Sequence, residues 1–337
     1  MPVELDAQTR MWRLAIAFRM SRILGVAVEF GIPEFLARHP HTSAQLAADT
    51  GTHEPSLRRM LRALVAMEVL AEDHEGRFSL TSLGDELRAD RFGPFVRFMD
   101  GEVDWKVWQH LDHSIKTGER AFDHVLGMRN WQYYASHPTH GAIFDAAMRA
   151  MTEPVARAVA SGYDFAQAHT VADVGGGDGT LLIAVLRQHK HLRGLLVDRP
   201  DVVERARGRF EDAGLIGRVE LAGGNFFEAV PPGADVYMMK SIIHDWNDDE
   251  AIAIMKRCRA ATERAPLLLI ERMLSDRIGP DDLDAVLSDI NMLVNPGGRE
   301  RTDREYSDLF AHAGYRLGRT IPLELGFQIL EGLPAAS

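Results

Sequence analysis

The sequence predicts an α/β protein, in which a doubly wound, mostly parallel sheet follows a mainly helical N-terminal domain. A chain of 337 residues is long for one hydrophobic core, which favours two domains. Residues 1–100 have the pattern of helices separated by turns. From residue 166 onward, short apolar segments alternate with helical patterns, as expected for parallel strands connected by helices.

The N-terminal part contains a helix, a second helix and a hairpin in that order. "TSAQLAADTG" has Thr42 or Ser43 as a possible N-cap and Gly51 just past its end. "PSLRRMLRALVAMEVL" repeats apolar residues at helical spacing, and "AEDHEGRFSLTSLG" places a polar turn between two apolar pieces. This order predicts a winged-helix-like domain, whose use is either DNA binding or dimerisation.

Composition limits the class of protein. Hydrophobic residues make up 46% and charged residues 26%, which is ordinary for a globular chain. The net charge of −11 argues against a nucleic-acid partner, because phosphate binding requires a basic surface. No apolar run approaches the roughly 20 residues that span a bilayer, and the N-terminus does not resemble a secretory signal. One cysteine fits a reducing compartment, so we expect a cytoplasmic protein without a membrane partner.

The second domain is expected to cover residues 101–337, with an α/β core at 166–337. A helical segment at 101–165, rich in Trp, Phe and Met, is expected to line a pocket. The core strands are predicted in "HTVADV", "LRGLLVD", "RVELAGG", "ADVYMMK" and "APLLLIERM". A helix is expected between the last two strands, from about Asp248 to Thr262.

A glycine-rich turn, "DVGGGDGT", follows the first predicted strand. It contains Asp173, Gly175, Gly177 and Gly179. The dinucleotide fingerprint G-x-G-x-x-G requires a third glycine where this chain has Thr180. The spacing instead resembles motif I of methyltransferases that use S-adenosylmethionine.

Two further strand ends carry residues suited to binding a ligand. Asp198 ends the second strand, where a carboxylate can accept hydrogen bonds from both ribose hydroxyls of an adenosine. Its alternative role is to cap the next helix, for which Asp201 is also available. After the third strand, "GGNFF" contains Asn225 and Phe226. These residues are expected at one edge of the sheet, where such folds bind ligands.

Longer blocks carry a resemblance to a known family. "DVGGGDG", "VDRPDVV", "GGNFFEAVPPGADVYMMKSIIHDWNDDE", "LLLIERM" and "DINMLVNPGGRERT" resemble the plant-type small-molecule O-methyltransferases, including bacterial members that modify aromatic natural products. The resemblance covers residues 10–330. It implies a Rossmann-like class I methyltransferase domain, S-adenosylmethionine as cofactor with S-adenosylhomocysteine as product, no metal, and a homodimer formed through the N-terminal domain. Antibiotic or other secondary metabolism is the implied setting.

The resemblance also implies roles for individual residues. His244, in "HDW", corresponds to the general base, with Glu271 and Glu300 on either side of it. A phenol has a pKa near 10, whereas an ordinary histidine with a pKa of about 6.5 is neutral at pH 7 and can accept its proton. Lys240 is expected near the adenosine, and Asp245 either orients the acceptor or caps the next helix.

Other family positions are expected to contact the acceptor. Phe144, Met148 and Met292 are suited to hold a flat aromatic ring by packing and sulfur–ring contact. Asn291 and Asn295 are expected to supply polar specificity. Asn225 departs from the family pattern, which usually has an acid there, although an amide can still bond to the edge of an adenine.

The sequence therefore predicts an enzyme that methylates an aromatic hydroxyl group of a small molecule. One alternative is a relative that retains S-adenosylmethionine but performs decarboxylation or hydroxylation, against which His244 and the two glutamates argue. The alternative from another class is a winged-helix DNA-binding protein that senses a small molecule.

Overall fold

The computed structural model describes residues 6–335, which form two compact units. The first unit extends to Lys106 and also contains His137–Met151. The second unit contains Val107–Ser136 and the chain from Thr152 onward. The sequence-based prediction set the domain boundary near residue 100 and assigned all of 101–165 to the second domain. In the structure, residues 101–106 and 137–151 belong to the first unit.

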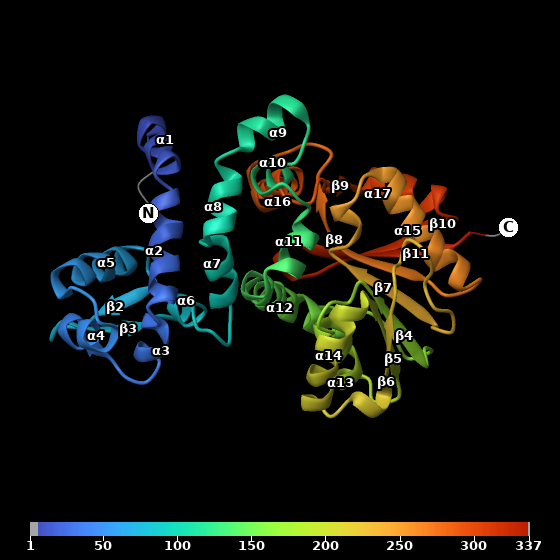
Figure 1. Ribbon diagram of the computed structural model, residues 1–337, viewed down its shortest axis with the longest axis horizontal. Helices are drawn as coiled ribbons and strands as arrows, with labels where there is room; N and C mark the ends of the chain where they lie inside the picture. The colour runs from blue at the N-terminus through green and yellow to red at the C-terminus, as the bar shows by residue number, and fades with distance from the viewer. Residues whose placement is uncertain (1–5, 336–337) are drawn as a thin grey trace. The chain divides into compact units, whose positions relative to one another are not determined.

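The first unit is mainly helical, with one small sheet (Figure 1). Its elements are α1 (Ala7–Ala15), α2 (Phe18–Glu29), α3 (Ile32–Leu36), β1 (His41–Thr42), α4 (Ser43–Thr50), α5 (Glu54–Ala66), β2 (Leu70–Glu72), β3 (Arg77–Leu80), α6 (Ser82–Asp85), α7 (Gly93–Met99) and most of α8 (Glu102–Trp108). Thr42 is the N-cap of α4 and forms a capping box with Gln45, and Gly51 ends the helix with a φ of 66°. Both predicted ends of this helix are confirmed.

The small sheet has the strand order β1–β3–β2, and both pairings are antiparallel. Strands β2 and β3 form the hairpin that the sequence predicts after the two helices. The core beneath them includes Leu46, Leu61 and Phe78, all of which are fully buried. The order helix, helix, hairpin is therefore present in the structure.

Four further helices lie between α8 and the first strand of the large sheet. They are α9 (Leu111–Thr117), α10 (Ala121–Leu126), α11 (Asn130–Ser136) and α12 (Pro138–Gly162). The first part of α12 belongs to the first unit, and its last part packs on the sheet of the second unit through Val155, Ala156 and Val159.

The second unit contains a large sheet with the strand order β10–β11–β8–β7–β4–β5–β6. Its parallel strands are β4 (Thr170–Val174), β5 (Arg193–Asp198), β6 (Val219–Gly223), β7 (Val236–Lys240) and β8 (Leu267–Leu274), and the short β9 (Arg301–Thr302) also pairs with β8. All five predicted core strands are present. Because these strands are parallel, their carboxyl ends meet at one edge of the sheet.

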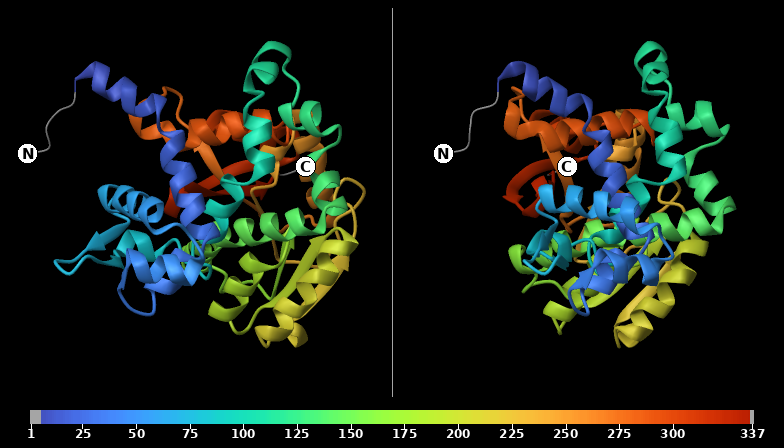
Figure 2. Two further views of the ribbon diagram at one scale, coloured as in Figure 1. Left: turned by 60° about the vertical axis from the view of Figure 1, so that its left-hand side comes forward. Right: turned by 90° about the vertical axis from the view of Figure 1, so that its left-hand side faces the viewer.

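Helices cover both faces of this sheet. They are α13 (Thr180–Gln188), α14 (Pro200–Asp212), α15 (Asp248–Ala261), α16 (Leu283–Val294) and α17 (Asp303–His312). One apolar core joins the sheet to α13, α14 and the end of α12, and a second joins the opposite face to α15 and α17. Helices α13 and α14 lie together against the parallel strands (Figure 2). The predicted doubly wound sheet is confirmed.

Two C-terminal strands were not predicted. β11 (Phe327–Pro334) pairs antiparallel with β8, and β10 (Tyr315–Pro322) pairs antiparallel with β11. β10 is mostly exposed, and its register shifts between Leu317 and Thr320. An exposed edge strand lacks the apolar pattern on which a sequence-based prediction depends. Among residues 6–335, no helix is long and apolar enough to cross a membrane.

Candidate active site

The loop after β4 turns through its glycines before α13 begins. Gly175 and Gly177 have φ angles of 73° and 57°, in the left-handed region that glycine adopts without strain. A Cβ atom on Gly175 would lie 2.5 Å from Cδ1 of Ile242, so this position leaves no room for a side chain. A Cβ on Gly177 would meet nothing within 4 Å. The backbone at Gly177 is therefore open to a ligand at the carboxyl edge of the sheet.

Asp198 connects the end of β5 to this glycine loop. Its Oδ2 accepts a hydrogen bond from the N–H of Gly177 at 2.9 Å, and its Oδ1 accepts one from the N–H of Arg199 at 2.7 Å. Burial raises the pKa of Asp198, and the two hydrogen bonds oppose that rise. The capping alternative is wrong, because Arg199 is the N-cap of α14 and Asp201 lies in its first turn.

Two more charged side chains lie close to the same edge. Asp173 is 1% exposed, and its Oδ2 has no hydrogen-bond partner within residues 6–335. Burial, followed by the charge of Asp198, raises the pKa of Asp173 to about 7. Burial lowers the pKa of Lys240 to about 8. The Nζ of Lys240 donates to Oγ of Ser241 at 3.0 Å and lies 4.9 Å from the ring centroid of Phe327.

These groups fit the cofactor that the resemblance implies. S-Adenosylmethionine carries ribose hydroxyls and an amino group that donate hydrogen bonds, and a carboxylate that accepts them. Asp198 and the unpartnered oxygen of Asp173 are acceptors, whereas Lys240 is a donor. The site thus offers hydrogen-bonding groups of both kinds.

Asn225 and Phe226 follow β6 and differ in what they offer. Oδ1 of Asn225 accepts a hydrogen bond from the N–H of Phe227 at 3.0 Å, and its amide donates to Glu228 at 3.1 Å. Asn225 therefore stabilises its own turn. Phe226 lies beside the glycine loop, since a Cβ placed on Gly175 would lie 3.7 Å from its ring atom Cε1. The adenine contacts expected for Asn225 and Phe226 stay predictions.

His244 lies in η2 (Ile243–Asp245), a single 3₁₀ turn between β7 and α15. Its Nδ1 is 3.0 Å from Oε1 of Glu300 and 3.7 Å from Oε2 of Glu271. Its Nε2 is 3.5 Å from Oδ1 of Asp245. The structure therefore brings the expected base and both expected glutamates together, and both glutamates face the same ring nitrogen.

Asp245 does not cap the helix that follows it. The N-cap of α15 is Asn247, whose side chain accepts from the N–H of Glu250, and the two residues form a capping box. The capping alternative for Asp245 is wrong, which leaves its carboxylate beside Nε2 of His244.

Glu271 is held by the backbone of the same turn. Its Oε1 accepts hydrogen bonds from the N–H groups of Ile242 and Ile243, at 3.1 Å and 2.9 Å. Ser241, just before them, has a φ of 54°, in the left-handed region. A left-handed residue followed by a right-handed one turns successive N–H groups toward one anion. Glu271 thus occupies an anion-binding turn, and its Oε2 has no hydrogen-bond partner in the described chain.

Glu300 is held by side chains of α16. Oγ of Ser288 donates to Oε1 of Glu300 at 2.7 Å, which is the oxygen that also contacts His244. Oδ1 of Asp289 accepts from the backbone N–H of Glu300 at 2.9 Å. Ser288 and Asp289 were not predicted from the sequence. The available signal was two polar residues side by side in the apolar helical stretch "LSDINMLV".

Burial and charge shift the pKa values in this cluster. Burial by itself lowers the pKa of His244, but the charges of Glu271 and Glu300 outweigh it and raise that pKa to about 10. Burial raises the pKa of Glu271, and it raises the pKa of Asp245 to about 7. Burial opposes ionisation of Glu300 too, but the charge and hydrogen bond of His244 lower its pKa. The pKa of His244 therefore differs from that of an ordinary histidine, in the direction that favours the imidazolium form.

The residues expected to contact the acceptor fall in both units. Nδ2 of Asn295 donates to Oδ1 of Asn291 at 2.6 Å, and Met292 is buried between them in the sequence of α16. Phe144 and Met148 lie on the part of α12 that belongs to the first unit, where the ring of Phe144 meets that of Phe98 at 5.6 Å. The structure thus joins the two asparagines to each other.

Two other features bear on the choice of site. One potential ligand atom from each of His244, Glu271 and Glu300 lies within 4.8 Å of the others. Oε1 of each glutamate already accepts hydrogen bonds from the protein, so this geometry serves an imidazole, and the absence of a metal stays a prediction.

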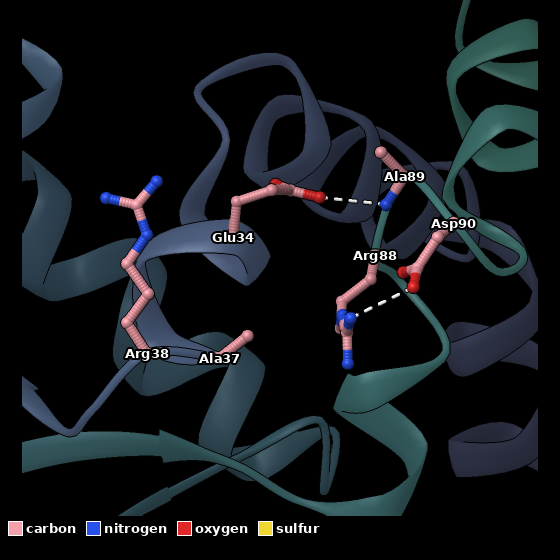
Figure 3. A pocket seen from close by; sticks show the side chains of 6 residues that line it. All are labelled: Glu34, Ala37, Arg38, Arg88, Ala89 and Asp90. Carbon is pink, nitrogen blue, oxygen red and sulfur yellow. Dashed lines mark hydrogen bonds and ion pairs between the residues drawn. The ribbon is translucent and has the colours of Figure 1, made fainter.

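A separate hollow in the first unit is lined by Glu34, Ala37, Arg38, Arg88, Ala89 and Asp90 (Figure 3). It contains none of the predicted site residues.

The fold and the polar edge of its sheet define a class I methyltransferase that uses S-adenosylmethionine. Comparison with known proteins agrees. Residues 108–316 match the O-methyltransferase domain, and residues 12–90 match the O-methyltransferase dimerisation domain. The chain belongs to this O-methyltransferase family and is an S-adenosylmethionine-dependent O-methyltransferase.

Individual relatives match over nearly the whole chain. The mitomycin biosynthesis 6-O-methyltransferase of Streptomyces lavendulae is 38% identical over 91% of this chain and 88% of its own length. The phenazine O-methyltransferase PhzM of Lysobacter antibioticus is 36% identical over 96% of this chain and 95% of its own. The solved structure of the mitomycin 7-O-methyltransferase MmcR is 36% identical, covers 98% of both chains and superposes with a TM-score of 0.87.

Proposed function

We propose that this enzyme methylates a phenolic hydroxyl group of an aromatic natural product, with His244 as the general base. The contact between Nδ1 of His244 and Oε1 of Glu300, at 3.0 Å, carries the proposal. Because Glu300 engages Nδ1, Nε2 is the nitrogen left to accept a proton. The relatives above are named for mitomycin and phenazine, which supports a natural product of secondary metabolism as the acceptor.

His244, Glu300 and Asp245 have different proposed roles in the methyl transfer. When bound, S-adenosylmethionine supplies a methyl group that its positive sulfur has already activated. The phenolic proton passes to Nε2 of His244 as the oxygen becomes the nucleophile. Glu300 holds the ring and stabilises the imidazolium that results. Asp245, near Nε2, orients the acceptor hydroxyl.

The raised pKa of His244 suits a phenol. A base with a pKa of about 10 takes a proton from a phenol of similar pKa with little change in free energy. A histidine of ordinary pKa would make the same transfer unfavourable by about 5 kcal/mol. The consequence is that only the fraction of enzyme with a neutral imidazole is active at pH 7.

Further residues bind the two substrates. For the cofactor we assign Asp198 to the ribose, Lys240 to the adenosine, Asp173 to the charged amino-acid part, and Asn225 and Phe226 to the adenine. The backbone of Gly175 and Gly177 is assigned to close approach by the cofactor. For the acceptor we assign Phe144, Met148 and Met292 to the ring, and Asn291 and Asn295 to its polar substituents.

Replacement of the base tests the proposal. His244→Ala should lower kcat by about 10²–10⁴ for a phenol of high pKa, which is the usual contribution of a general base. Affinity for S-adenosylhomocysteine should stay within a factor of about three. The loss should shrink for a nitrophenol, which is already ionised. His189→Ala is the matched control, because His189 also makes one hydrogen bond, to the carbonyl oxygen of Ala160.

An undiminished kcat in His244→Ala would place the base elsewhere. Equal losses with acidic and weakly acidic phenols would show that His244 acts by positioning alone. Mass spectrometry of the product distinguishes the non-methylating alternative, because methylation adds one methyl group to the acceptor. A gel-shift titration of the full chain with DNA tests the alternative of a winged-helix DNA-binding protein, which no observation described above supports.

The proposed assembly is a homodimer formed through the dimerisation domain. Helix α1 has no buried residue, and it exposes Met11, Trp12 and Leu14 to 60–69%. Phe18 on α2 is also more than half exposed. Large apolar side chains gathered in this way are typical of a surface that a second protein covers. The proposed location is the cytoplasm, in agreement with a single cysteine that is buried and free.

A further inference from the structure

Arg301 is a buried arginine with no assigned role. It lies in β9, directly after Glu300, and its exposed fraction is 0%. Its Nε and Nη2 both donate to Oδ1 of Asp248, at 2.9 Å and 2.8 Å. Nη2 also donates to the carbonyl oxygen of Trp246 at 2.7 Å, and Nη1 to those of Ile243 at 3.1 Å and Arg299 at 3.4 Å. Its hydrogen bonds therefore surround the turn that carries His244.

That turn has little structure of its own. It is a single 3₁₀ turn with two backbone hydrogen bonds of its own. The N–H of Asp245 donates to the carbonyl oxygen of Ile242 at 3.2 Å, and the N–H of Trp246 donates to that of Ile243 at 3.3 Å. Isolated 3₁₀ turns have poor hydrogen-bond geometry, so their shape depends on outside contacts. Glu271 binds the N–H groups at the start of the turn, and Arg301 binds the carbonyl groups at Ile243 and Trp246. Glu271 thus holds backbone donors of the turn, and Arg301 holds backbone acceptors.

Residues 298–301 make several different contacts with His244 and its turn. The N–H of Arg299 donates to the carbonyl oxygen of His244 at 2.8 Å. The carboxylate of Glu300 contacts Nδ1 of His244. Arg301 donates hydrogen bonds to the carbonyl groups of Ile243 and Trp246, which flank His244 in the chain. A Cβ on Gly298 would overlap the carbonyl oxygen of His244, so the two backbones lie against each other. One short segment thus fixes both the turn and the carboxylate that the imidazole needs.

We propose that Arg301 is a positioning residue that keeps His244 in register with Glu300, an inference that rests on the proposed role of His244 as the base. Arginine suits this task because its planar fork presents five donors in fixed directions. A lysine at this position would keep the charge opposite Asp248 but could not reach the carbonyl groups of Ile243 and Trp246 together. Arg301 touches neither the reacting atoms nor the cofactor edge, so its effect passes through the imidazole.

The test compares Arg301→Met and Arg301→Lys with His244→Ala in the full-length enzyme. Concentrations of active sites are set by calorimetric titration with S-adenosylhomocysteine, so that unfolded protein does not count. Arg218→Met is the matched control, because Arg218 also donates to backbone carbonyl groups, those of His189 and Leu192, far along the chain from His244. For each variant, kcat and KM are measured from pH 7 to 10 with a weakly acidic phenol and a nitrophenol.

We expect Arg301→Met to lower kcat per active site about 100-fold for the weakly acidic phenol, the size of effect that a misplacement of about 1 Å produces. Arg301→Lys should lose about tenfold. The loss should be smaller for the nitrophenol, and the rise of kcat with pH should move to lower pH, because a weaker contact with Glu300 supports the imidazolium less. KM for the acceptor should change less than kcat.

Each other outcome has a definite meaning. A normal kcat in Arg301→Met beside a strong loss in His244→Ala overturns the role of Arg301 and leaves the base in place. A normal kcat in His244→Ala overturns the proposed function itself. An equal loss in Arg218→Met, or an unmoved pH profile, shows that Arg301 supports only general stability. If Arg301→Met does not fold, the pH profile of Arg301→Lys decides by the same criterion.

Discussion

The imidazole of His244 and the carboxylate of Glu300 form one close contact, with 3.0 Å between Nδ1 and Oε1. Oγ of Ser288 donates to the same oxygen from the other side, at 2.7 Å. Glu271 is farther from the ring, at 3.7 Å, and uses its Oε1 to bind two backbone N–H groups. The geometry therefore favours Glu300 as the residue that sets the ring tautomer and Glu271 as the residue that shapes the turn.

The two glutamates should fail in different ways when replaced. Glu300→Gln should lower kcat at the high-pH plateau about 10- to 100-fold, because the charge that stabilises the imidazolium is lost, and it should move the rise of kcat to lower pH. Its melting temperature should fall less than that of Glu271→Ala. Glu271→Ala should lower the free energy of unfolding by about 3 kcal/mol, because one buried and one partly buried N–H group lose their acceptor. Thermal unfolding and steady-state kinetics separate the effects. The reverse pattern would exchange the two roles.

Activity toward a weakly acidic phenol should rise from pH 7 to about pH 10. The carboxylates raise the pKa of His244 to about 10, so the neutral, active imidazole becomes more abundant with each step toward that pH. Below pH 9 the fraction should grow about tenfold per pH unit. Measurement of kcat across this range checks the prediction. A plateau already reached near pH 7 would mean that the base has an ordinary pKa.

Loss of the Asp198 charge should weaken cofactor binding. Each charge-assisted hydrogen bond to the ribose contributes about 1.5–3 kcal/mol, so Asp198→Asn should raise the dissociation constant of S-adenosylhomocysteine at least tenfold. The amide oxygen can still accept from the N–H of Gly177, which preserves the loop. Asp201→Asn is the control, because Asp201 lies in the exposed first turn of α14. Calorimetry showing equal affinities would remove Asp198 from the cofactor site.

The assembly prediction concerns the apolar surface of α1 and α2. Light scattering at micromolar concentration should give the mass of a dimer, and Trp12→Glu should shift the protein toward the monomer. A buried charge without a partner is costly at an interface, which is the reason for this choice. Ile115→Glu is the control, because Ile115 is 64% exposed in the second unit. A wild-type monomer with full activity would exclude the dimer.

Local signals in the sequence predicted most of the fold. The parallel strands are short apolar runs between turns, and the helix at Ser43–Thr50 has both of its caps in the sequence. The strand β10 was not predicted because its exposed residues, such as Arg316 and Thr320, are held by pairing with β11 and not by an apolar face of their own.

The site shows a similar division. His244, Glu271 and Glu300 lie in motifs that resemble the O-methyltransferase family, so their roles could be predicted from that resemblance. Their pKa values could not be predicted, because the shift of His244 depends on burial beside two carboxylates that are distant in the sequence. Arg301 gives no sequence signal of its role, since an arginine beside a glutamate is ordinary on a protein surface and only the fold shows it to be buried.

The division of the chain into two units has a consequence for how acceptor choice can change. The base, its carboxylates and the arginine that holds their turn all belong to the second unit, with every hydrogen bond described for them made inside it. Phe144 and Met148, proposed to hold the acceptor ring, belong to the first. On the proposed assignment, substitutions at Phe144 and Met148 alter the choice of acceptor and leave the hydrogen bonds around His244 in place.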